Sequence, residues 1–277
     1  MTGGCAGCRA EPWADVLWLP EPGSGMAGER CRPPRESPAA LPVPSGADAR
    51  TRRRWILGHQ VAFMVWRLTA DALIPLTAPT SAHGPSAVEE AARLYDLSSA
   101  LFVYTGSCSA ERYEATVRAD MRNCDPAFSG EWAADHAPLP GLLARVRSAH
   151  PPRVLGRLMD AVHTGHRVHR AMAERLVPHG ASLLRTAGRP SGRGPTPDEI
   201  SRYDAFFRVE RGPVCRSGFA VQLLRRTEWM LADLATHGLD GGGPQLPLDE
   251  ATVVGHLEEL AHSLTTTIAR EESPVPL

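Results

Sequence analysis

The sequence contains no lysine, and all 30 of its basic residues are arginine. With its heavy use of Ala, Gly and Pro, this composition is typical of a bacterial gene of high G+C content. The chain of 277 residues has a net charge of −1, so it lacks the basic surplus of a nucleic-acid-binding protein. Its length is sufficient for a sizeable core.

Long apolar runs are also missing. No stretch reaches the roughly 18 apolar residues of a membrane span, and the first residues lack the pattern of a secretory signal. We therefore expect a cytoplasmic protein with reduced thiols. Cysteines number 6, and the pair Cys5 and Cys8 has no second pair at zinc-ribbon spacing, so we expect no metal there.

The first fifty residues differ in composition from the rest. Residues 1–50 are rich in Pro, Gly, Ala and Glu, as in EPGSGMAGERCRPPRESPAALPVPSG. Such a composition buries little apolar surface, so we expect a low-complexity, loosely packed segment that contributes little to the core. Residues 51–277 are expected to form a single helical domain.

Helical signals dominate this second part, and no segment shows the alternation of a convincing strand. Ser86 with Glu89, and Thr196 with Glu199, have the spacing of capping boxes, and Pro197 occupies a first helical position. The sequence therefore predicts an all-α helical bundle. The expected helices cover residues 54–73, 86–104, 110–122, 152–178, 218–238 and 248–271, with loops at 125–141 and 187–195.

One histidine interrupts the apolar segment WILGHQVAFMVWRL, residues 55–68. The helix is apolar nearly all round and is expected to be buried. A buried imidazole needs a hydrogen-bond partner or a functional role. His59 is therefore either a core histidine satisfied by a neighbour or part of a site.

Three more histidines lie in DAVHTGHRVHRAMAERLV, residues 160–177. His163 and His169 point about 120° apart on a helix, so the three cannot all bind one compact ion. No H-E-x-x-H motif supports a zinc peptidase. His166 and His169 are expected to interrupt a buried stripe, and with His59 they favour a heme enclosed by the bundle. That stripe comprises Leu155, Leu158, Val162, His166, His169, Ala173 and Leu176.

Two of these stretches resemble tryptophan 2,3-dioxygenases. His59 and Gln60 resemble the helix whose histidine lies over the distal face of the heme, and HRAMAERLVPHG resembles the helix of the axial histidine. The dioxygenase loop GTGGSSG is replaced by GASLLRTAGRPSGRG. Residues 104–136 are more similar to the heme-dependent tyrosine hydroxylases of natural-product pathways, a branch of the same heme-dependent aromatic oxygenase superfamily.

The resemblance implies the roles of these histidines. His169 would be the axial ligand of a heme b, with His166 as the alternative, and His59 would act as an acid–base group on the distal side. Ala173 stands where some relatives have a cysteine that attaches heme covalently, so the heme is expected to be non-covalent. The implied reaction is hydroxylation of L-tyrosine at C3 to 3,4-dihydroxyphenylalanine, with hydrogen peroxide or O2 as the oxidant.

The substrate site is assigned by the same resemblance. An arginine suits the substrate carboxylate because its guanidinium donates two parallel hydrogen bonds. The FSGEW segment would line the pocket. The candidate residues are Arg112, Arg118 and Arg122 for the carboxylate, and Ser129, Gly130 and Trp132 for the pocket.

Other functions fit the same residues. The chain could open the indole ring of tryptophan with O2, as a dioxygenase, or act as a non-catalytic heme sensor. It could also be a helical regulatory protein whose histidines are simply packed. Relatives of the suspected family are often oligomers, so a homo-oligomer is possible, with no membrane or nucleic-acid partner.

Overall fold

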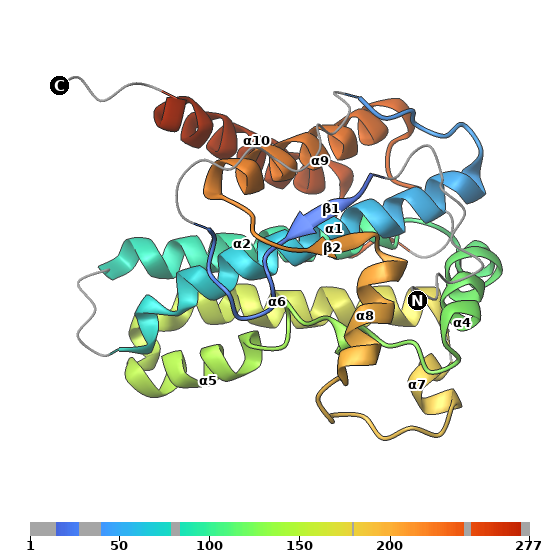
Figure 1. Cartoon of the computed structure of the whole chain (residues 1–277), viewed down its shortest axis with the longest axis horizontal. Helices are drawn as coiled ribbons and strands as arrows, with labels where there is room; N and C mark the ends of the chain where they lie inside the picture. The colour runs from blue at the N-terminus through green and yellow to red at the C-terminus, as the bar shows by residue number, and fades with distance from the viewer. Residues whose placement is uncertain (1–14, 28–39, 79–83, 179, 241–244, 273–277) are drawn as a thin grey trace.

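The computed structural model shows a bundle of helices (Figure 1), which confirms the all-α prediction. None of the helices in the described part of the chain combines the length and apolar composition that a membrane crossing needs. The structure describes residues 15–27, 40–78, 84–178, 180–240 and 245–272.

Three long helices form the centre of the bundle. Helix α2 (Gly84–Thr105) packs against both α1 (Ala47–Leu73) and α6 (Pro152–Leu176). The contact between α1 and α2 is close at Gly58, where an added Cβ atom would lie 2.2 Å from the Thr105 hydroxyl. Glycine at this position therefore sets how near the two backbones approach.

A second pair of helices covers α1 and α2 from the other side. Helix α9 (Arg216–His237) runs beside α10 (Glu250–Glu272), and they appear in orange and red at the top of Figure 1. The predicted end of α9 is confirmed, because Gly238 follows it with a φ of 61°, a left-handed conformation that glycine adopts without strain.

Short helices complete the bundle. The predicted helix over 110–122 is confirmed, although a π turn interrupts it, and an unpredicted helix, α5, follows the loop after it. The elements are η1 (Pro75–Thr77), α3 (Ala110–Tyr113), η2 (Glu114–Arg118), α4 (Ala119–Cys124), η3 (Gly130–Trp132), α5 (Leu139–Ala149), α7 (Leu183–Thr186) and α8 (Pro197–Phe206).

Two capping boxes were expected from the sequence. The box at the start of α8 is confirmed, because the Thr196 side chain accepts from the Glu199 backbone and the Glu199 side chain accepts from the Thr196 backbone. The other is wrong, because α2 already begins at Gly84 and Ser86 lies within the helix.

The expectation that residues 1–50 contribute little to the core is wrong for the described stretch of residues 15–27. Strand β1 (Leu17–Leu19) pairs in parallel with β2 (Val209–Arg211), and the side chains of Leu17 and Leu19 are completely buried. Neither strand was predicted, because three residues are too few to show the alternation of a strand. The pair Cys5 and Cys8 lies outside the described residues.

The N-terminal strand is held by buried polar side chains. Gln60 on α1 donates to the backbone carbonyls of Asp15 and Phe207, each at 2.9 Å. Arg226 on α9 is fully buried and donates to the Val16 carbonyl at 2.8 Å. Gln60, which stands beside His59, is therefore a structural residue.

Candidate functional site

His59 has a defined tautomer in this structure. Its Nδ1 lies 2.7 Å from the Trp55 carbonyl oxygen, one turn earlier on α1. Because a carbonyl only accepts hydrogen bonds, Nδ1 carries the hydrogen and Nε2 is left as an acceptor. Burial lowers the pKa of His59 to about 4, so the ring is neutral at physiological pH.

The ring next to His59 carries a donor without a partner. The buried indole N–H of Trp55 has no hydrogen-bond partner among the described residues, and the hydrogen bond found there for the His59 ring is the one at Nδ1. The two rings are in contact, with 4.5 Å between their centroids. One donor and one acceptor in adjacent rings match a hydroxyl group, which donates one hydrogen bond and accepts another.

Aromatic side chains surround His59 and form what we call the aromatic wall. Phe207 stacks on the imidazole, and Phe63 links Phe207 to Trp66 through ring contacts of 5.3 and 5.6 Å. The wall draws on α1, on the loop of residues 125–138 and on the end of α8. Its members are Trp55, Phe63, Trp66, Phe128, Trp132, Tyr203, Phe206 and Phe207.

A group of histidines borders the far end of this wall. His136 meets Trp66 edge to face, with 5.0 Å between ring centroids, and His169 lies 4.8 Å from Phe102. Partial burial lowers the pKa of His136, and the nearby charges of His169 and His166 lower it further. Partial burial and then His166 lower the pKa of His169. The three imidazoles therefore share one region.

The predicted burial of the α6 histidines is wrong. His166 and His169 are exposed, and so are His163 and Ala173. The C-terminal half of α6 buries Gly165, Val168 and Met172, each of which directly precedes one of the exposed stripe residues His166, His169 and Ala173 and so lies about 100° away from it around the helix. The buried face instead comprises Leu155, Leu158, Ala161, Val162, Gly165, Val168, Met172, Arg175 and Leu176.

The exposed histidines nevertheless fit a heme. An axial ligand must be a neutral imidazole that a large planar group can reach, and the heme needs apolar surface beside it. His169 is exposed and its lowered pKa favours the neutral form, while Phe102 and Trp66 provide aromatic surface nearby. Within the described residues no cluster of three His, Cys, Asp or Glu side chains is arranged for a metal ion alone.

The structure does not bring His59 into the histidine group. Among the described residues His59 makes ring contacts with Trp55, Phe63 and Phe207, but with no other histidine. Phe63 and Trp66 lie between His59 and His136 along the wall. His59 and the histidine group thus border the same aromatic surface at two places.

The three candidate arginines have different surroundings. Arg112 pairs with Asp240 at 2.9 Å and with Asp48 at 3.3 Å. Arg122 is exposed and pairs with Glu114 at 2.6 Å. These ion pairs occupy both guanidinium groups at the protein surface.

Arg118 is the candidate that connects to His59. Its side chain is 14% exposed and donates to the Ala181 carbonyl oxygen at 2.7 Å. Burial raises the pKa of Tyr113, and the charge of Arg118 opposes that rise, so the two side chains are close. Tyr113 packs on Trp55 with 5.3 Å between centroids, and Trp55 contacts His59.

The FSGEW residues divide between the wall and the surface. Trp132 is 2% exposed and contacts Phe128, so it belongs to the aromatic wall. Ser129 accepts from the Glu131 backbone at 3.2 Å and caps η3, while Gly130 is exposed with open space around it. Of the three, only Trp132 is part of the aromatic wall, and the pocket role of all three stays a prediction.

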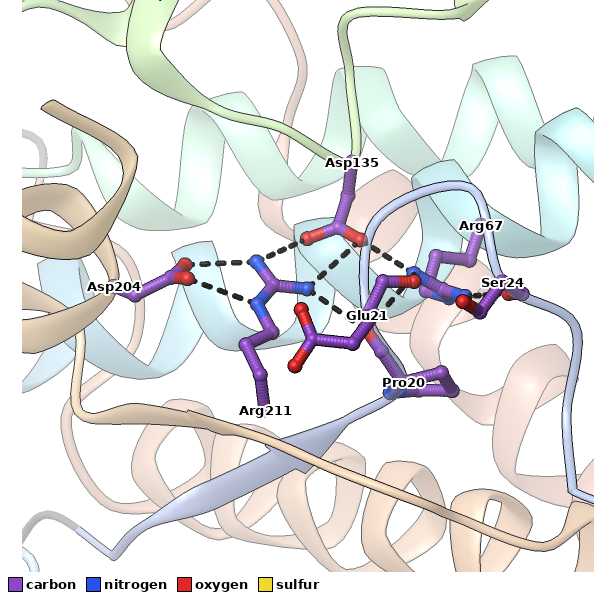
Figure 2. A network of polar contacts seen from close by, with 7 residues as sticks. All are labelled: Pro20, Glu21, Ser24, Arg67, Asp135, Asp204 and Arg211. Atoms are coloured by element: carbon purple, nitrogen blue, oxygen red, sulfur yellow. Dashed lines mark hydrogen bonds and ion pairs between the residues drawn. The ribbon is translucent and has the colours of Figure 1, made fainter. Parts of the chain in front are cut away.

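Sequence reasoning missed a buried ionic network that holds this region together (Figure 2). Asp135 accepts from Arg67 at 2.8 Å and from both terminal nitrogens of Arg211 at 2.9 and 3.1 Å. Arg211 also donates to Asp204 at 2.7 and 2.9 Å. Burial raises the pKa of Asp204, and Arg211 opposes that rise. Partners 68 and 76 positions apart leave no local signal in the sequence.

Comparison with known proteins identifies the family. No curated protein matches the chain. A sequence model of the SfmD 3-methyl-L-tyrosine peroxygenase family matches residues 10–163, which is more than half of the chain. The match includes His59, Trp55, Arg118 and Asp135, and it ends just before His166. The chain belongs to the SfmD 3-methyl-L-tyrosine peroxygenase family.

Proposed function

We propose that this protein is a heme-dependent peroxygenase that hydroxylates L-tyrosine at C3 and releases 3,4-dihydroxyphenylalanine and water. Membership of a peroxygenase family supports peroxide as the oxidant and a tyrosine-like molecule as the substrate. The observation that carries the proposal is the contact between the ring of His59, whose Nε2 can accept a hydrogen bond, and the ring of Trp55, whose buried N–H has no partner among the described residues, because a phenol hydroxyl can both donate and accept.

His59 would bind the phenol through Nε2. A hydrogen bond from the phenol O–H to this nitrogen increases the electron density on the ring carbons ortho to the hydroxyl, which favours oxygen delivery at C3. With a pKa of about 4 the imidazole is a weak base, so it orients and polarises the phenol rather than removing its proton completely. The Trp55 indole N–H would donate to the same oxygen.

The aromatic wall would bind the substrate ring and exclude water from it. Offset or edge-to-face contacts between aromatic rings add about 0.5–1.5 kcal/mol to the burial of their area. Arg118 would bind the carboxylate of the amino acid. It already points its guanidinium toward acceptors, the Ala181 carbonyl and the Glu114 carboxylate, and would exchange one of these for the substrate.

His169 would hold the heme iron, with His166 as the alternative ligand. A bound heme would supply the oxidising chemistry, which breaks the peroxide O–O bond so that one oxygen enters the C3–H bond and the other leaves as water. Ala173, one turn after His169, has no thiol for a covalent attachment, so the heme would be held non-covalently.

The family description favours a second substrate, 3-methyl-L-tyrosine. Its hydroxyl group would make the same hydrogen bonds with His59 and Trp55. One carbon ortho to the hydroxyl carries the methyl group, so oxygen would enter at the other, C5. The added methyl group would improve binding by about 0.8 kcal/mol if the aromatic wall receives it without a clash.

Mass spectrometry of the products tests the proposal. Protein supplied with heme and hydrogen peroxide is incubated with L-tyrosine, 3-methyl-L-tyrosine and L-tryptophan in parallel. A gain of one oxygen on either tyrosine supports the peroxygenase, and the faster of the two identifies the preferred substrate. A gain of two oxygens on tryptophan alone would instead identify a dioxygenase.

Two controls separate the remaining functions. A Soret band without turnover of any substrate would favour a heme sensor, and the absence of a Soret band would favour packed histidines with no cofactor. His59→Ala should keep the Soret band but lose about 10²–10⁴-fold in turnover, the usual contribution of a positioned acid–base group. His163→Ala, an exposed histidine on α6, should change neither.

A further inference from the structure

The ionic network is joined to the aromatic wall through neighbouring residues. Three of its four charged residues are each next in sequence to an aromatic or imidazole side chain that belongs to this wall or contacts it. Each charged side chain therefore fixes the backbone on which an aromatic ring is carried. The neighbouring pairs are Arg67 with Trp66, Asp135 with His136, and Asp204 with Tyr203.

Asp135 is the centre of this network, as Figure 2 shows. Its two oxygens accept from Arg67 on α1 and from Arg211 on β2, and its side chain is only 1% exposed. Arg67 also donates to the carbonyl of Pro20 at 3.3 Å and to that of Ser24 at 2.5 Å. One carboxylate thus ties the loop of residues 125–138 to the central helix, to the sheet and to the N-terminal segment.

The charges within the network are balanced. Two guanidinium groups face two carboxylates, and the side chains of Arg67, Arg211 and Asp204 are between 10% and 12% exposed. A buried pair that loses one partner leaves an uncompensated charge, so the arrangement has one strongly preferred geometry. The loop that carries Trp132 and His136 is consequently fixed against α1.

We propose that Asp135 is a positioning residue of the substrate site. By fixing the loop of residues 125–138 against α1, it would set the distance between the parts of the aromatic wall and so the orientation of the substrate ring. The inference rests on the proposed function. It concerns a residue that touches neither the substrate nor the cofactor and acts through Trp132 and His136.

Asp135→Asn tests this role, with Asp233→Asn as the matched control. Asp233 is as deeply buried and pairs with Arg54 at 2.6 Å, but it lies on α9, which contributes no residue to the aromatic wall. Arg54 directly precedes Trp55, yet in Asp233→Asn it keeps its hydrogen bonds to the Ser107 hydroxyl and the Gly238 carbonyl, so the backbone at Trp55 should stay in place. Both variants should lower the melting temperature, because each leaves a buried arginine without its carboxylate.

Substrate binding should separate the two variants. In heme-loaded protein, Asp135→Asn should raise the KM for L-tyrosine about 10- to 100-fold, because a misplacement of about 1 Å costs up to about 10²-fold. Asp233→Asn should change KM less than about twofold. Equal effects of the two variants on KM, or no effect of either, would overturn the positioning role.

Hydrogen exchange of the heme-free protein supplies an independent readout. Asp135→Asn should accelerate exchange across residues 126–138 while α9 and α10 remain protected, and Asp233→Asn should leave that loop protected. If Asp135→Asn fails to fold, Asp204→Asn provides the test, because it removes one partner of Arg211 and keeps the Arg67 contact. A loop that stays protected in the folded variant would contradict the inference.

The two proposals fail in different ways. A wild-type protein that shows no Soret band and no turnover would overturn the proposed function, and the substrate role of Asp135 with it. If the wild type is active but Asp135→Asn changes neither the KM for L-tyrosine nor the hydrogen exchange of the loop, only the positioning role is overturned.

Discussion

His59 and Phe207 lie ring over ring, with 4.4 Å between their centroids and 18° between their planes. The contact joins the middle of α1 to the residue that ends α8, and it covers one face of the imidazole with a phenyl group. A protonated imidazole would lose hydration in this position, which is the physical reason for its low pKa. The stack therefore keeps His59 neutral.

The first prediction concerns the pH dependence of stability. The pKa of His59 is about 4 in the folded protein and 6.5 when unperturbed, so its contribution is fully present above pH 6.5 and is lost as the pH falls toward 4. Between pH 7.5 and pH 5 this histidine should remove about 2 kcal/mol from the free energy of unfolding. Urea unfolding of heme-free wild type and His59→Gln at both pH values measures it.

His59→Gln should be the less pH-sensitive of the two proteins by that amount. His136 and His169 also have lowered pKa values and remain in both proteins, so the comparison isolates His59. If the free energy of unfolding falls equally in the two proteins between pH 7.5 and pH 5, the prediction fails, and the imidazole of His59 is hydrated in solution.

The second prediction concerns the axial ligand. His169→Ala should lose most of the heme, or leave a five-coordinate heme whose spectrum added imidazole restores, because the substitution removes the imidazole proposed to bind the iron. Absorption spectra during a heme titration give the result, with His163→Ala as the control on the same helix. If His169→Ala binds heme normally and His166→Ala loses it, His166 is the axial ligand instead.

The third prediction concerns the N-terminal strand. Leu19→Ala should lower the free energy of unfolding by about 2–5 kcal/mol, as expected for a completely buried leucine. Val154→Ala is the control, since Val154 is 44% exposed and its loss should cost less than about 0.5 kcal/mol. If urea unfolding gives the same free energy of unfolding for the two variants, the N-terminal segment around Leu19 is only loosely attached and the prediction is wrong.

The fourth prediction concerns the contact between α1 and α2. Gly58→Ala should destabilise the protein by about 1–3 kcal/mol, because the new methyl group would overlap the Thr105 hydroxyl. Gly156→Ala on α6 meets nothing within 4 Å and should stabilise by about 0.4–1 kcal/mol through reduced backbone entropy of the unfolded chain. Thermal melts that rank the two variants in the opposite order would contradict the close helix contact.

Local patterns in the sequence predicted the helices well. The capping box at Thr196 and Glu199 and the terminal Gly238 are confirmed because their signals involve residues three or four positions apart. The predicted face of α6 was wrong at His166, His169 and Ala173 because the residue directly before each of them is the buried one, and one residue is about 100° around the helix. His166 and His169 consequently lie at the surface.

The parts of the site that could not be predicted depend on contacts between residues that lie far apart in the sequence. The wall around His59 depends on Phe207, which is 148 positions away, and the network depends on Asp135 meeting Arg67 and Arg211. Such contacts form only after the helices pack, so neither composition nor spacing reveals them. The family match supports the peroxygenase chemistry, whereas the resemblance to tryptophan 2,3-dioxygenases and the roles of individual residues stay predictions.

The pairing of β1 with β2 also determines when the chain can finish folding. Leu17 pairs with Val209 on β2, which follows it by 192 positions. At the usual rate of about 5–20 residues per second, a ribosome needs about 10–40 s to synthesise that interval. Throughout this time the first strand has no partner, so the apolar side chains of Leu17 and Leu19 depend on chaperones or transient contacts for protection from aggregation.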